Sequence, residues 1–115
     1  MNRCRTLREE TVRVVDLTPG DLLAPDFFGR LNAAALAHEP TVFVVHNTGF
    51  ANGVPLPLAF ANPCLVDWAP AFRLRGARVR AGELAAVLAR ARAVCAAGHG
   101  PFWVELLEND MSEEA

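Results

Sequence analysis

A short polar run directly after an apolar strand is the first place where this sequence could do chemistry. Residues 41–45 are apolar or β-branched, and they are followed by His46, Asn47, Thr48 and Gly49. In an open α/β sheet, ligands bind just beyond the carboxyl ends of the strands. The run therefore either lines a ligand crevice or closes a strand-to-loop turn. His46 either contacts a ligand or is satisfied by nearby hydrogen bonds.

Arginines form a second group of candidate binding residues. Arg73, Arg75, Arg78 and Arg80 surround Gly76. Guanidinium groups in such a cluster suit phosphate or an acidic partner. Exposed arginines are also common on any solvated surface, where they contribute little energy. The cluster is therefore either an anion site or ordinary surface.

The remaining reactive side chains do not form a catalytic set. Cys4, Cys64 and Cys95 are scattered, without a CxxC pair or a histidine spacing for zinc, which favours reduced thiols in a cytoplasmic protein. His99 stands between two glycines, and we expect it to be structural. No Ser-His-Asp or Cys-His arrangement is supported by the sequence, so we name no catalytic residue.

Composition limits the class of protein. The chain has 115 residues, and its 11 basic and 13 acidic residues give a net charge of −2, which predicts one domain without a nucleic-acid partner. Hydrophobic residues make up 52%, which predicts that another chain covers part of the surface. No apolar run reaches the ~20 residues of a membrane span, and no signal peptide is recognisable.

Hydrophobic periodicity predicts an α/β domain. We expect strands at 11–17, 41–46, 77–79 and 101–107, and helices at 26–39, 65–74 and 82–97, with a long loop at 51–64. Asp26 and Asp67 are candidate helix caps, and Gly76 and Gly98 are expected to end helices. Trp68 and Trp103 are candidates for the core or an interface. Residues 1–10 are expected to form a flexible arm and 108–115 an acidic disordered tail.

This order of elements, with three particular stretches, resembles the thiamine-diphosphate (TPP) enzymes. Residues 31–35 and 40–47 are similar to the family's helix and central strand, and 47–51 to its Asn-Asn-Gly-Tyr-Ala-like turn. Residues 76–79 and 82–105 match its closing αβ unit. The likeness is strongest to the alpha subunit of the dehydrogenase component of 2-oxoacid dehydrogenase complexes. It implies a truncated TPP-binding fold over residues 11–107, with a mostly parallel four-stranded sheet flanked by three helices.

The resemblance also implies a metal and cofactor site. The family's metal motif would begin at Gly20-Asp21 and end at Asn47-Thr48, with 26 residues between Asp21 and Thr48. Magnesium prefers hard oxygen ligands, which here would be the Asp21 carboxylate, the Thr48 side chain and the Phe50 carbonyl. By the same resemblance, TPP would lie against Gly20, Asp21, Asn47, Thr48 and Gly49.

Two positions depart from the family's motif. Leu22 replaces the second glycine, which makes a close approach of backbone to phosphate harder. Thr48 replaces the second asparagine, although a hydroxyl can still ligate magnesium. Asp21 itself is either a metal ligand or a turn and cap residue after Pro19-Gly20.

The resemblance implies that the chain needs a partner to work. The family's first half of the diphosphate-binding domain, its pyrimidine-binding domain and its later active-site loop have no counterpart in these residues. We expect a small subunit or split piece of a 2-oxoacid dehydrogenase-like or transketolase-like enzyme, paired with a larger subunit or forming a homodimer. The alternative is a degenerate, non-catalytic assembly module. The family's fold requires a parallel first strand pair, with Gly20 and Phe50 on the same rim.

Overall fold

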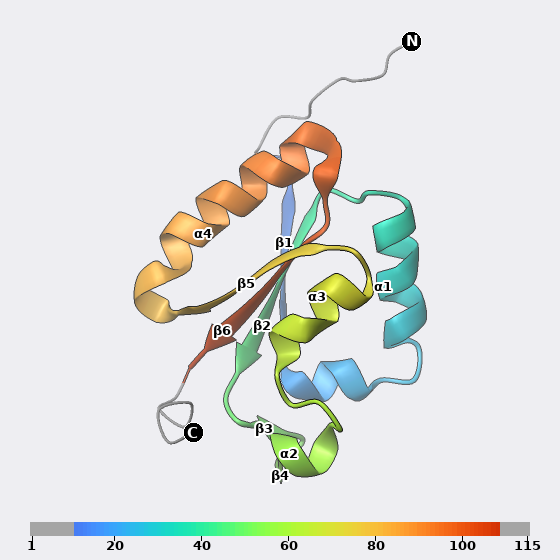
Figure 1. Cartoon of the computed structure of the whole chain (residues 1–115), viewed down its shortest axis with the longest axis vertical. Helices are drawn as coiled ribbons and strands as arrows, with labels where there is room; N and C mark the ends of the chain where they lie inside the picture. The colour runs from blue at the N-terminus through green and yellow to red at the C-terminus, as the bar shows by residue number, and fades with distance from the viewer. Residues whose placement is uncertain (1–10, 109–115) are drawn as a thin grey trace.

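The fold is a four-stranded sheet between two layers of helices (Figure 1). The computed structural model describes residues 11–108, so the arm expected at 1–10 lies outside the described residues, as does the tail expected at 108–115 apart from Glu108. The strands lie in the order β1-β2-β6-β5, and all three pairings are parallel, which confirms the expected α/β class. Their bounds are β1 Arg13–Leu17, β2 Thr41–Asn47, β5 Arg75–Arg80 and β6 Phe102–Leu107.

Helix α1 (Phe27–Leu36) follows the predicted pattern and packs on one face of the sheet. Phe27, Leu31 and Ala34 are buried, as their i, i+4, i+7 spacing predicts. The helix was expected to reach residue 39 but ends earlier, and His38 beyond it is exposed with a left-handed backbone (φ 52°). Asp26 occupies the cap position, but its side chain makes no capping hydrogen bond.

Helix α4 (Ala81–Val94) covers the opposite face of the sheet. Val87, Ala91 and Cys95 are buried at successive i, i+4 positions. The helix continues into a π-helical turn at Cys95–His99, where Gly98 has φ 89° and supplies the expected stop. Burial raises the pKa of the Cys95 thiol, which keeps it protonated and unreactive. Both Cys64 and Cys95 are free thiols.

The segment expected to be a long loop at 51–64 contains structure. Strands β3 (Phe50–Ala51) and β4 (Val54–Pro55) form a small antiparallel hairpin, and α2 (Leu56–Ala59) follows it. The turn is Asn52-Gly53, with φ of 52° and 83°. Two positive φ values in a two-residue hairpin are typical of a type I′ turn, for which Asn-Gly is a strong sequence signal. The prolines that follow this turn favoured a loop over a hairpin in the sequence analysis.

The helix expected at 65–74 is shorter than predicted. It consists of a 3-10 turn, η3 (Leu65–Asp67), and one helical turn, α3 (Trp68–Ala71), on the same face as α1. Gly76 does not end it but lies inside β5, where an added Cβ would come within 2.6 Å of the Ala69 Cβ. A glycine is needed there because α3 packs directly on the strand.

The alternating strand residues divide the core into two halves. Val42, Val44 and Val104 face α4, whereas Val45 and Trp103 face α1 and α3. Trp103 is completely buried, and Trp68 stacks on it with ring centroids 5.8 Å apart. Trp103 therefore belongs to the packed interior, whereas Trp68 is half-buried and packs against it. Within residues 11–108, no helix has the length and apolar character needed to cross a membrane.

Candidate functional site

The two ends of the expected motif meet at the carboxyl edge of the sheet, at the bottom of Figure 1. The 3-10 helix η2 (Pro19–Leu23) follows β1 and packs against β3, which begins at Phe50. Gly20 lies so close to Asn52 that an added Cβ would overlap that side chain. Together with the parallel pairing of β1 and β2, this confirms that Gly20 and Phe50 share one rim.

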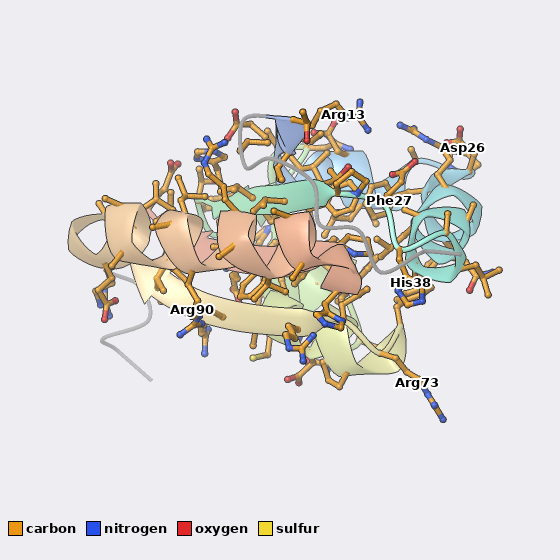
Figure 2. The ribbon with its side chains drawn as sticks, turned by 90° about the horizontal axis from the view of Figure 1, so that it is seen from above. Arg13, Asp26, Phe27, His38, Arg73 and Arg90 are labelled. Atoms are coloured by element: carbon orange, nitrogen blue, oxygen red, sulfur yellow. The ribbon has the colours of Figure 1, made fainter. Side chains whose placement is uncertain are left out.

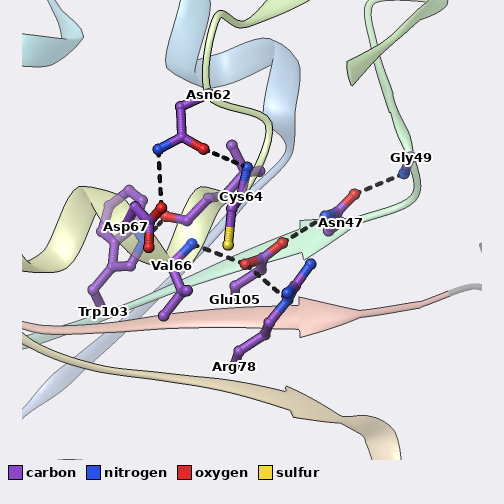
Figure 3. Close-up of polar contacts among 10 residues, drawn as sticks. Asn47, Gly49, Asn62, Cys64, Val66, Asp67, Arg78, Trp103 and Glu105 are labelled. Atoms are coloured by element: carbon purple, nitrogen blue, oxygen red, sulfur yellow. Dashed lines mark hydrogen bonds and ion pairs between the residues drawn. The ribbon is translucent and has the colours of Figure 1, made fainter. Parts of the chain in front are cut away.

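Asn47 shapes the turn at the end of β2 through both ends of its buried side-chain amide (Figure 3). Its Oδ1 accepts a hydrogen bond from the Gly49 backbone N–H at 2.8 Å. Its Nδ2 donates to Glu105 Oε2 at 2.6 Å. Each end of the amide makes one hydrogen bond within the protein, and the two bonds together orient the turn.

Glu105 is the buried carboxylate that holds three segments together beneath this turn (Figure 3). It is fully buried in β6, and besides Asn47 it accepts the Val66 backbone N–H at 2.8 Å. The Arg78 guanidinium on the neighbouring strand lies 3.4 Å from its Oε1. Sequence reasoning missed this residue. Its signal is a single charged side chain within the otherwise apolar strand Phe102–Leu107.

The arginine group is divided by the fold. Arg78 pairs with Glu105, and Arg80 precedes α4, where its backbone N–H donates to Glu83. Arg73 and Arg75 instead lie at the opposite, amino edge of the sheet, where β5 begins. The four side chains therefore do not form one anion site.

The three expected metal ligands are hard oxygen donors on adjoining segments. The Thr48 hydroxyl donates to the Phe50 carbonyl at 3.5 Å, so these two oxygens lie side by side. Asp21 Oδ2 accepts the Thr18 backbone N–H at 2.8 Å in a capping box, while no hydrogen bond to Oδ1 occurs among the described residues. Such a donor set fits the coordination preference of magnesium.

Leu22 does not obstruct this edge, although the sequence suggested that it would. Its side chain is only 2% exposed and packs in the core with Phe27 and Leu31. The residue that replaces the family's second glycine therefore points into the interior. The exposed side chains of η2 are Asp21 and Leu23.

His46 is held on the other face of the same edge. Its Nε2 contacts Asp16 Oδ1 at 2.8 Å, and its Nδ1 contacts Glu108 Oε2 at 2.5 Å. The three residues occupy equivalent alternating positions on β1, β2 and the end of β6, so their side chains project to one face. The hydrogen bond to Asp16 and then that to Glu108 raise the pKa of His46 above its ordinary value. The interpretation of a histidine satisfied by neighbours is correct, although the neighbours come from distant strands.

This raised pKa predicts pH-dependent stability. The protonated His46 side chain stabilises the folded state fully below its unfolded-state pKa of about 6.5. This stabilisation is lost as pH rises through the higher folded-state pKa. We expect the loss in free energy of unfolding caused by His46→Gln to be larger near pH 6 than near pH 9, with urea unfolding as the measurement. Asp16→Asn should reduce this pH dependence. Parallel stability curves for wild type and His46→Gln would contradict the prediction.

Comparison with known proteins agrees with this arrangement. The family described as dehydrogenase E1 component matches residues 17–108. The chain is 33% identical over 102 residues to the 3-methyl-2-oxobutanoate dehydrogenase subunit alpha of two Mycobacterium tuberculosis strains, CDC 1551 / Oshkosh and ATCC 25618 / H37Rv. The aligned region covers 86% of this chain and 28% of each relative. The matched segment contains both η2 and the 47–50 turn. Because the family match spans most of the chain, the chain belongs to the dehydrogenase E1 component family, a family of thiamine-diphosphate enzymes.

Proposed function

We propose that this chain is a small subunit or split piece of a TPP-dependent 2-oxoacid dehydrogenase-like enzyme. Residues 11–107 would form part of its TPP-binding domain and supply part of the magnesium and diphosphate site. The observation that carries the proposal is the meeting of η2 with the 47–50 turn in a chain of this family. The reaction class would be 2-oxoacid decarboxylation with acyl transfer. The alternative reaction class is a transketolase-like two-carbon transfer.

The proposed site assigns a role to each residue at the carboxyl edge. Asp21, Thr48 and the Phe50 carbonyl would hold magnesium, and Gly20 and Gly49 would lie against the diphosphate. When bound, TPP would supply the nucleophilic carbon that adds to the substrate's carbonyl carbon. The chain's own contribution is positioning, because Asn47 and the carboxylate network fix the turn that carries Thr48.

A partner chain is part of the proposal. The chain spans 28% of the length of the curated relatives it matches. Several large apolar side chains on η2, α1, the hairpin and α2 are exposed: Leu23, Phe28, Phe50, Val54 and Leu58. A second subunit, either a larger enzyme chain or another copy, would cover this surface next to the site. The free thiols are compatible with a cytoplasmic location for the complex.

The proposal is tested by calorimetry on the chain combined with a partner that supplies the missing parts of the enzyme. A neighbouring gene that encodes the missing parts is the first place to look for such a partner. We expect TPP to bind only when magnesium is present. Asp21→Asn keeps an acceptor for the Thr18 N–H but removes the charge, and should weaken TPP binding by at least about tenfold. Asp26→Asn, an exposed carboxylate at the start of α1, is the matched control and should leave binding unchanged.

A non-catalytic assembly module is the second candidate. The observation in its favour is that Asp21 is already used in the capping box with Thr18. On this alternative, the partner complex forms with unchanged affinity in Asp21→Asn, and TPP does not bind with or without magnesium. Magnesium-dependent TPP binding would eliminate it.

A further inference from the structure

A second candidate site lies at the amino edge of the sheet, away from the edge where TPP is proposed to bind. A cavity of about 510 Å³ opens there between the end of α1, α3 and the start of β5. This volume is within the range of small-molecule sites, which is roughly 300–1,000 Å³. Leu36, Phe72 and Leu74 give it an apolar wall.

Most of the polar side chains that line this cavity are arginine or histidine. Arg73, Arg75, His38 and His99 line it, and among the described residues no Asp or Glu does. None of these four side chains makes a hydrogen bond or ion pair with another described residue. Within residues 11–108 neither arginine has an acidic partner, so two positively charged guanidinium groups lie beside the apolar wall.

Three separate connections bring these side chains together. His38 joins α1 to β2, Arg73 joins α3 to β5, and His99 lies between α4 and β6. Figure 2 looks down on this edge and shows His38 and Arg73 on neighbouring segments, with the Arg73 side chain extending to the outer rim. The convergence is a product of the parallel topology, since every connection entering a strand reaches this same edge.

Two of the residues occupy backbone positions that glycine usually fills. His38 and Arg73 follow α1 and α3 in left-handed conformations, with φ of 52° and 61°. The end of α1 also places about half a negative charge near the cavity, but two guanidinium groups outweigh it.

We propose that this cavity binds a small organic phosphate. The guanidinium groups of Arg73 and Arg75 hold the phosphoryl oxygens, and the organic part lies against Leu36 and Phe72. Arginine suits this ligand because its planar fork can donate two parallel hydrogen bonds to one phosphate. The site is independent of magnesium and of the carboxyl edge.

Phenyl phosphate is the probe that tests the proposal, titrated calorimetrically into the full chain in the presence of EDTA. We expect saturable binding to one site, with inorganic phosphate binding there more weakly. The double variant Arg73→Gln/Arg75→Gln should lose at least about tenfold in affinity. The matched control Arg90→Gln/Arg92→Gln removes the same charge from α4 and should stay within about twofold.

Amide chemical shifts in the wild-type chain give a test that needs no variant. Phenyl phosphate should shift the signals of residues 35–38, 72–75 and 99–100. Lack of saturable binding, shifts confined to the 47–50 turn, or equal losses in the two double variants would overturn the proposal. Equal affinity for inorganic phosphate and phenyl phosphate would overturn the organic part of the assignment.

Discussion

We expect Glu105→Ala to lower the free energy of unfolding by about 3–5 kcal/mol. The substitution removes the acceptor for the buried Asn47 amide and for the Val66 backbone N–H, and each unpaired donor costs about 1–3 kcal/mol. It also leaves a cavity beneath the 47–50 turn. Urea unfolding followed by circular dichroism measures the effect as a shift in midpoint at constant m.

Two control variants distinguish the loss of the Glu105 hydrogen bonds from the general effect of truncating a side chain. Glu105→Gln keeps the shape but turns one acceptor into a donor, so it should cost about 1–2 kcal/mol. Glu83→Ala removes an exposed carboxylate that accepts one backbone N–H, from Arg80, and should cost less than about 1 kcal/mol. If Glu105→Ala were no more destabilising than Glu83→Ala, the network would not support the fold.

Trp103→Ala is expected to cost a similar amount, about 3–5 kcal/mol, for a different reason. The side chain is completely buried, and its ring stacks parallel to that of Trp68. Phe27 and Phe43 also pack against it, with ring centroids 6.3 and 5.9 Å away. Truncation opens a large cavity between the sheet and α3. The same urea experiment measures the loss.

The environment of Trp103 predicts an order among related variants. Trp103→Phe keeps a ring in place but removes the indole N–H that donates to the Leu65 carbonyl at 2.8 Å, and should cost about 1–2 kcal/mol. The Phe28 ring stacks on the outer face of Trp68 and is itself 57% exposed. Phe28→Ala should therefore lower the free energy of unfolding by only about 0.5–1.5 kcal/mol. If Trp103→Phe and Trp103→Ala lowered the free energy of unfolding equally, the hydrogen bond and not packing would dominate the contribution of Trp103.

The main elements could be predicted from the sequence because each carries a periodic pattern that depends on neighbouring residues alone. The face of α4 that contains Val87, Ala91 and Cys95 is an example, and so is the apolar run of β2. Prediction failed where local signals competed. The prolines outweighed the hairpin turn at Asn52-Gly53, and Gly76 was interpreted as a helix stop although it permits close packing with Ala69.

The candidate site was predictable only in part. Gly20, Asp21, Thr48 and Gly49 are candidates because a family's spacing marks them, and the fold places their segments together. The hydrogen bonds of Asn47 could not be foreseen, because its partner Glu105 lies 58 residues away in the chain. The roles of Arg73 and Arg78 differ for a similar reason, since an ion pair with a distant strand is not visible in local sequence.

The sequence by itself therefore determined the α/β class, the positions of the principal strands and helices, and the family. Those properties follow from side-chain periodicity and turn residues, which act over a few positions. Only the tertiary structure decided which polar side chains come together. His46 lies between Asp16 and Glu108, and Arg73 and His99 line one cavity. Parallel pairing brings distant strand ends to common edges, and that juxtaposition is a property of the assembled sheet.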